Sequence, residues 1–145
     1  MELTVLFPAD HREFATASIT GHHLVPYDPA RPAEADGGER AQVLVAPFLT
    51  DSALVEHAAT LPRLRLVQLL TVGADAWLGR VPDGVHLATG RGAHSAATAE
   101  WVLGAMLAVY REFPAFLAAA AEGQWRPRRT DGLFGRRVLV VGAGD

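Results

Sequence analysis

The sequence contains no cysteine and no lysine in its 145 residues. The absence of cysteine excludes disulfide bonds, thiolate zinc sites and cysteine nucleophiles within these residues. All 13 basic side chains are therefore arginine, and the formal net charge of −3 differs from the strongly basic character of nucleic-acid-binding domains. The chain does not begin with a secretory leader pattern, and no apolar run reaches the length of a membrane span. These absences predict a soluble, cytoplasmic protein that binds neither nucleic acid nor a membrane.

Motifs for metal binding and for serine hydrolysis are also missing. Two of the six histidines, His22 and His23, are adjacent, and the others are scattered without the spacing of metal ligands. We therefore predict no metal site. No Gly-x-Ser-x-Gly segment is present, so a serine hydrolase has no support.

The first ninety residues alternate between β-rich and helical segments. Apolar, β-branched runs predict strands at 3–7, 24–27, 42–46, 64–70 and 85–89. Helical patterns at 10–19, with Asp10 as N-cap, and at 51–61, with Thr50 or Asp51 as N-cap, lie between strands. This alternation favours an α/β fold with a parallel sheet covered by helices on both faces.

A longer helical pattern begins near Ser95, which is the expected N-cap. Its apolar residues recur at spacings of three and four, namely Ala99, Val102, Leu103, Met106, Leu107 and Tyr110. A second helix is predicted after Pro114, from about Ala115 to Glu122, with Gly123 at its end. Five arginines then cluster near Trp125, and we interpret this segment as a solvated linker or a contact to the missing domain rather than a nucleic-acid site.

The last residues have the pattern of a phosphate-binding turn. The run 138–141 predicts a buried parallel strand, and Gly142-Ala143-Gly144 follows at once. The first glycine permits a tight turn, and the second lets the backbone approach a pyrophosphate. The third glycine of the G-x-G-x-x-G pattern would fall beyond the chain, and an unpaired apolar strand favours aggregation, so we expect a truncated protein. An ordinary turn is the alternative.

Four segments in this order resemble the D-isomer-specific 2-hydroxyacid dehydrogenases. They are 66–75, 88–92, 94–103 and 133–144. The resemblance covers most of the chain from about Gln42 onward. It implies a flavodoxin-like, parallel-sheet substrate domain at 1–93. The crossover helix and the first strand of a Rossmann NAD(P)-binding domain would follow at 94–145.

The same resemblance implies an activity and partners. The cofactor would be NAD or NADP, and the substrate a small 2-oxoacid such as glyoxylate or hydroxypyruvate, or the corresponding D-2-hydroxyacid. The full-length enzyme would be a homodimer, with part of the contact on the Ser95 helix. The family's catalytic arginine, histidine and carboxylate lie downstream of the glycine-rich loop. No catalytic residue is therefore assigned in this chain, which we expect to be inactive by itself.

The substrate-binding role falls first on a glycine turn. Val72 and Gly73 resemble the family loop whose backbone N–H groups hold the substrate carboxylate, since glycine exposes amides without a covering side chain. A purely structural turn capped by Asp75 is the alternative.

Four further residues correspond to binding positions of the family. His94 stands where formate dehydrogenases carry a substrate-polarising asparagine, which argues against formate, and a neutral loop histidine is the alternative. Thr98 stands where the family contacts the nicotinamide end of the cofactor. The alternative is a threonine at a helix start whose side chain bonds to its own backbone. Gly142 and Gly144 would approach the cofactor pyrophosphate.

Two other interpretations stay open. The chain could be a non-catalytic flavodoxin-like binding or dimerisation module whose Gly-x-Gly is incidental. It could also come from a different two-domain Rossmann oxidoreductase, although the Thr98-Ala99-Glu100 helix just upstream of the glycine-rich turn disfavours that.

Overall fold

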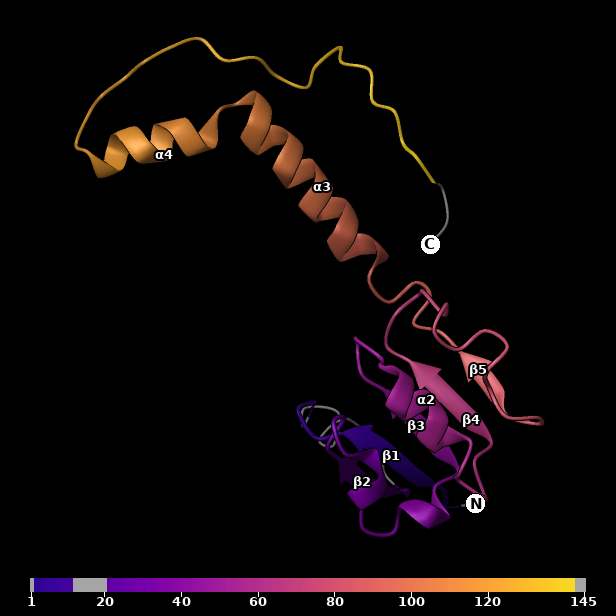
Figure 1. Ribbon diagram of the computed structural model, residues 1–145. Coiled ribbons are helices and arrows are strands. Elements are labelled where there is room, and N and C mark those ends of the chain that lie inside the picture. Colours follow the sequence, from indigo (N-terminus) through magenta and orange to yellow (C-terminus); the bar gives the residue numbers. More distant parts are fainter. Residues whose placement is uncertain (1, 12–20, 143–145) are drawn as a thin grey trace. The chain divides into compact units, whose positions relative to one another are not determined.

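The computed structural model describes residues 2–11 and 21–142. The chain divides into two compact units, Met1–Arg91 and Gly92–Asp145. Within the described residues, the first unit holds a β-sheet and one α-helix, and the second holds two α-helices (Figure 1).

The sheet of the first unit consists of parallel strands in the order β2-β1-β3-β4-β5 (Figure 1). The strands are β1 (Thr4–Pro8), β2 (His23–Tyr27), β3 (Val43–Ala46), β4 (Leu66–Leu69) and β5 (His86–Ala88). Every neighbouring pair is parallel. This order is that of flavodoxin-like folds, so the predicted α/β fold class is confirmed.

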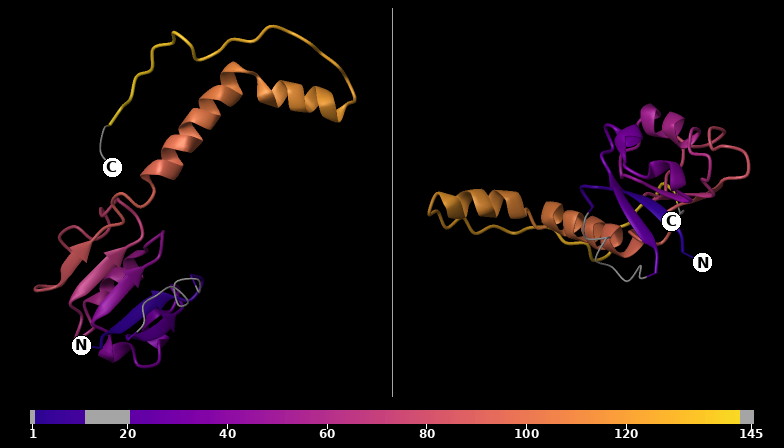
Figure 2. Two further views of the ribbon diagram at one scale, coloured as in Figure 1. Left: turned by 180° about the vertical axis from the view of Figure 1, so that it is seen from behind. Right: turned by 90° about the horizontal axis from the view of Figure 1, so that it is seen from below.

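Helix α2 (Ser52–Ala58) lies over one face of the sheet (Figures 1 and 2). Of the two predicted N-caps, the structure selects Asp51, whose carboxylate accepts a hydrogen bond of 2.9 Å from the N–H of Leu54. This bond satisfies one of the backbone donors that the first turn of a helix leaves unpaired. The helix predicted at 10–19 falls almost entirely outside the described residues, so cover on the second face stays a prediction.

Along β3 and β4, side chains alternate between buried core positions and partly exposed ones. Leu44 on β3 and Val67 on β4 are fully buried, while their neighbours along each strand are only partly covered. The period of two places one side-chain set of each strand against α2. Trp77, in the turn after β4, completes this core and is only 1% exposed.

Tyr27 is a buried phenol that ties β2 to β3. Its hydroxyl donates to the carbonyl of Val45 at 2.9 Å. Burial, with smaller contributions from Asp10 and Asp51, raises the pKa of Tyr27 well above its ordinary range. The folded chain therefore holds this proton more tightly than the unfolded chain.

We expect stability to fall as the pH rises above about 10, the ordinary pKa of tyrosine. Above that pH the unfolded chain loses the Tyr27 proton while the folded chain keeps it, so unfolding becomes more favourable. The sequence has no lysine to titrate in the same range. Urea unfolding at pH 8 to 11.5 measures the effect. Tyr27→Phe should lose the alkaline slope and Tyr110→Phe should keep it; the reverse result would contradict the assignment.

The second unit contains α3 (Ser95–Tyr110) and α4 (Phe113–Ala121), with a bend of 65° between them. The N-cap of α3 lies one residue before the predicted Ser95. Ser95 already belongs to the helix and His94 is the N-cap, with its carbonyl accepting from the N–H of Thr98 at 2.9 Å. Glu112, in the left-handed region at φ 53°, separates the two helices.

The apolar stripe predicted on α3 is not buried in this structure. None of the helix residues is buried, and Trp101, which lies outside the predicted stripe, is 73% exposed. Apolar residues occur on all sides of α3, so the spacing does not define a single inward face. Among the described residues no single helix is long and apolar enough to cross a bilayer; α3 and α4 reach that length and composition only as a bent pair.

The strand predicted at 138–141 is not formed as a strand in this structure. These four apolar residues are exposed, and they pair with no other strand in the described part of the chain. A strand is stable only when its N–H and C=O groups bond to a neighbour. The apolar run alone therefore does not produce the predicted element.

Candidate functional site

A hollow of about 390 Å³ lies at the carboxyl ends of β3 and β4 in the first unit. Its lining residues come from the segments that follow these strands and are Phe48, Leu49, Thr50, Leu69, Thr71, Gly73, Asp75, Ala76 and Trp77. We call it the Gly73 hollow. In open parallel sheets, ligands bind beyond the carboxyl ends of the strands, so this is the candidate site of the first unit.

The turn that contains Gly73 is held by hydrogen bonds at both ends. The hydroxyl of Thr71 donates to the carbonyl of Gly73 at 3.0 Å. The N–H of Gly90 donates to the carbonyl of Thr71 at 2.8 Å and so connects the turn to the chain after β5. A Cβ atom added to Gly90 would lie 2.7 Å from the carbonyl oxygen of Leu70. The close approach of these two segments therefore needs glycine at position 90.

Two adjacent backbone donors lie in this turn. The N–H groups of Val72 and Gly73 donate to no acceptor among the described residues. A Cβ added to Gly73 would contact only the Asp75 carboxylate, at 3.6 Å, so the missing side chain leaves the amides uncovered rather than making room for packing. Successive N–H groups of a turn that point to the same side bind anions, and this is the role that the family resemblance predicts for these two. The negative charge of Asp75 opposes anions in the same hollow, so a bound carboxylate relies on these amides.

The other predicted site residues lie in the second unit. His94 and Thr98 come together at the first turn of α3, joined by the backbone bond described above. Gly142 has φ +89°, a conformation that favours glycine and suits a tight turn. Gly144 lies outside the described residues. The structure thus groups Val72 with Gly73, and His94 with Thr98, and the roles of these residues stay predictions.

Sequence reasoning missed the apolar wall of the Gly73 hollow. Phe48 and Leu49 come one residue after the predicted strand at 42–46, at the same sheet edge as the predicted carboxylate loop. Position at the end of a strand was therefore an available signal. Nothing in the pattern around Trp77 indicated that this side chain would be buried.

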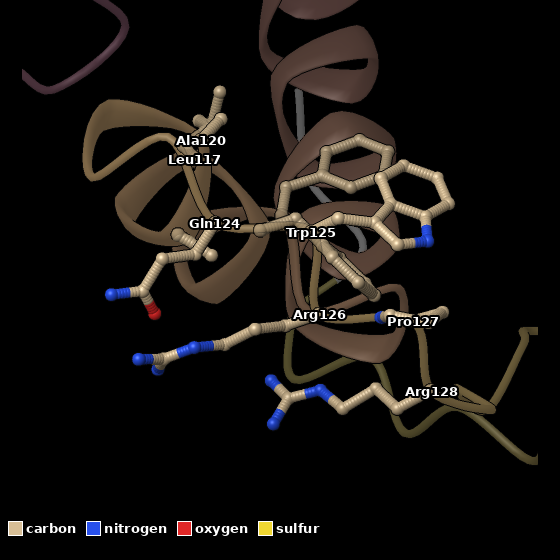
Figure 3. A pocket seen from close by; sticks show the side chains of 10 residues that line it. Leu117, Ala120, Gln124, Trp125, Arg126, Pro127 and Arg128 are labelled. Carbon is tan, nitrogen blue, oxygen red and sulfur yellow. The ribbon is translucent and has the colours of Figure 1, made fainter.

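A second hollow, of about 620 Å³, lies between α4 and the segment 124–128 (Figure 3). The arginines near Trp125 are largely paired with carboxylates, in the pairs Arg126–Glu122, Arg128–Glu112 and Arg136–Asp131. Arg128 also lies over the ring of Phe116, 5.5 Å from its centre. These contacts balance much of the positive charge and give no support to a nucleic-acid site. In the described part of the chain, no three acidic or histidine side chains gather as metal ligands.

Comparisons with known proteins show which proteins the chain is similar to. No protein-family model matches it. It is 31% identical over 164 aligned positions to proteins named D-3-phosphoglycerate dehydrogenase from Mycobacterium bovis and Mycobacterium tuberculosis. The alignment covers 99% of this chain and 28% of each relative, so the chain spans less than a third of their length.

Solved structures show the same fold. A D-isomer specific 2-hydroxyacid dehydrogenase family protein from Aeromonas salmonicida superimposes with a TM-score of 0.71 at 22% identity, over 94% of this chain and 44% of that one. A D-isomer specific 2-hydroxyacid dehydrogenase from Xanthobacter autotrophicus, solved with NADPH and MES, gives 0.62 at 22% identity, over 88% and 42%. An NAD-dependent formate dehydrogenase from Staphylococcus aureus, solved with NAD, gives 0.58 at 17% identity, over 87% and 43%. The chain is therefore similar, in sequence and in fold, to part of the D-isomer-specific 2-hydroxyacid dehydrogenases, as its motifs predict.

Proposed function

We propose that this chain is part of an NAD(P)-dependent oxidoreductase that interconverts a D-2-hydroxyacid and a 2-oxoacid, such as glyoxylate or hydroxypyruvate. The observation that carries the proposal is the pair of unpaired N–H groups of Val72 and Gly73 beside a hollow at the carboxyl end of β4. The similarity to proteins named as dehydrogenases of this kind supports the same conclusion.

The residues of the first unit bind and orient the substrate in this proposal. The N–H groups of Val72 and Gly73 donate to the substrate carboxylate, and charge-assisted bonds of this kind are stronger than neutral ones. The bonds from Thr71 and Gly90 hold the turn in the binding conformation, so little ordering is needed when the substrate arrives. The 2-oxo carbon is thereby fixed relative to a carboxylate that does not react.

The residues of the second unit contribute to cofactor binding. The bound nicotinamide supplies or accepts the hydride. Thr98, at the first turn of α3, would contact the nicotinamide end, and His94 would contact the substrate. Gly142, whose positive φ suits the tight turn of a glycine-rich loop, approaches the pyrophosphate together with Gly144. NAD and NADP both fit this proposal, since structural neighbours were solved with NADPH and with NAD.

Two further parts of the proposal concern assembly and activity. The exposed apolar residues of α3, such as Trp101 and Leu103, supply surface for a homodimer of the full-length enzyme. The 145-residue chain alone is expected to oxidise no NADH in the presence of glyoxylate, because no residue in it is assigned the acid–base role. Steady turnover by the purified chain would overturn this part.

A titration of the ¹⁵N-labelled chain with glyoxylate tests the binding role. We expect the amide resonances of Val72 and Gly73 to shift in a saturable way, and uncharged glyoxylamide to leave them in place. Gly73→Val should weaken glyoxylate binding about tenfold or more, which corresponds to about 1.4 kcal/mol, because a branched side chain covers the two amides. The backbone at Gly73 accepts a Cβ without a clash, so the variant is expected to fold.

The control variant is Gly104→Ala, in the interior of α3, where a Cβ meets nothing within 4 Å. It should leave glyoxylate binding unchanged. Shifts confined to another part of the chain, or equal affinity of Gly73→Val and the unaltered chain, would contradict the proposed function.

A further inference from the structure

One wall of the Gly73 hollow is apolar and open to solvent. Phe48 and Leu49, which follow β3, are 49% and 92% exposed and line the hollow. Ala76 and the buried ring of Trp77 continue the apolar surface. A ligand held by the Gly73 amides would therefore place its remaining atoms against hydrocarbon.

The charges around the hollow also favour an uncharged ligand group over a second anionic one. Among the described residues that line it, Asp75 is the one charged side chain, and none is an arginine or a histidine. His11 has its ring centre 6.3 Å from that of Phe48 but is not a lining residue. A phosphate group carries a charge of about −1.5 to −2 near neutral pH. In this hollow it would face the like charge of the Asp75 carboxylate, with no cation among the described lining residues to pair with, and like charges at close range repel each other.

We infer that the Gly73 hollow selects 2-oxoacids whose substituent at carbon 3 is uncharged and apolar, and that it disfavours phosphorylated 2-oxoacids. This inference rests on the proposed function, because it assumes that the carboxylate binds the amides of Val72 and Gly73. It separates this chain from its curated relatives, whose name, D-3-phosphoglycerate dehydrogenase, specifies a phosphorylated substrate. The selectivity comes from Phe48 and Leu49, which accept hydrocarbon, and from Asp75, which repels a second anion.

Titration of the ¹⁵N-labelled chain with three ligands tests the selectivity. The ligands are glyoxylate, 4-methyl-2-oxopentanoate and 3-phosphohydroxypyruvate, and the readout is the affinity reported by the Gly73 amide. Burial of one CH₂ group is worth about 0.8 kcal/mol, close to a fourfold change in affinity. We expect 4-methyl-2-oxopentanoate to bind at least about fivefold tighter than glyoxylate, and the phosphorylated acid to bind no tighter than glyoxylate.

Three substitutions at two exposed lining positions, Leu49 and Asp75, should change the relative affinities for the apolar and the phosphorylated ligand. Leu49→Arg supplies the missing cation and should strengthen binding of 3-phosphohydroxypyruvate at least about tenfold while weakening that of 4-methyl-2-oxopentanoate. Leu49→Ser should weaken only the apolar ligand. Asp75→Asn should favour the phosphorylated ligand and leave the order of the two unphosphorylated acids unchanged.

The outcomes separate the inference from the proposed function. If the phosphorylated acid binds tightest to the unaltered chain, with the Gly73 amide shifted, the selectivity inference is wrong and the proposed function stands. If no 2-oxoacid shifts the Gly73 amide, the proposed function fails and the inference fails with it. If the apolar acid binds tightest and Leu49→Ser removes that advantage, both are supported.

Discussion

Replacing Trp77 with alanine is expected to destabilise the first unit by about 3–5 kcal/mol, the usual cost of removing a buried aromatic side chain. Trp77 is 1% exposed and belongs to the core cluster of the sheet and α2. Alanine would leave a cavity that the surrounding strands cannot fill without moving. Urea unfolding followed by circular dichroism, together with hydrogen-exchange protection of the β3 and β4 amides, measures the loss in the first unit.

The matched control is Trp77→Phe. The indole Nε1 of Trp77 is buried and has no hydrogen-bond acceptor among the described residues, and an unsatisfied buried donor lowers stability. Phenylalanine retains much of the apolar volume and removes that donor, so it should cost much less than alanine. A Trp77→Ala variant within about 1 kcal/mol of the unaltered chain would show that this turn is not part of the core.

Replacing Gly90 with alanine should be the second large effect, a loss of about 1–3 kcal/mol, as expected for overpacking. The added Cβ would lie 2.7 Å from the oxygen and 3.0 Å from the carbon of the Leu70 carbonyl, and these backbone atoms cannot rotate away. Separation of the two segments would also break the bond from the Gly90 N–H to the Thr71 carbonyl. The variant should therefore reduce both the unfolding free energy and the affinity of the Gly73 turn for glyoxylate.

Gly38→Ala provides the control for a buried glycine in the same unit. A Cβ there would make ordinary contacts, 3.5 Å from Ala35 and 3.9 Å from Leu6. We expect a change within about 0.5 kcal/mol, as for a substitution without strain. Equal effects of the two substitutions would refute the specific role of the contact between Gly90 and Leu70.

Local patterns in the sequence predicted most of the sheet. The apolar runs at β3 and β4 and the Asp51 cap of α2 are short-range features, and the structure confirms them. The contact of Gly90 with Leu70 joins residues twenty positions apart, and no local pattern encodes it. The same holds for Trp77, whose burial depends on how the turn after β4 folds back on the core.

The errors in the second unit have a common physical cause. The helix at α3 was predicted correctly, but its apolar stripe is buried only if another surface packs against it. The run at 138–141 likewise forms a strand only if a neighbouring strand pairs with it. Periodicity shows which residues are apolar and does not supply that partner. In the candidate site, the family resemblance indicated Val72 and Gly73, while the apolar wall at Phe48 and Leu49 became visible only when β3 and β4 were placed side by side.

In the proposed function, the turn after β4 binds the carboxylate of a 2-oxoacid through its backbone. A crystal structure of the chain with oxamate, an unreactive 2-oxoacid analogue, would show this contact. We expect carboxylate oxygens at about 2.7–3.2 Å from the backbone nitrogens of Val72 and Gly73, with the rest of the ligand toward Phe48 and Leu49. Oxamate bound elsewhere, or these two N–H groups bonded to acceptors of the protein itself, would contradict it.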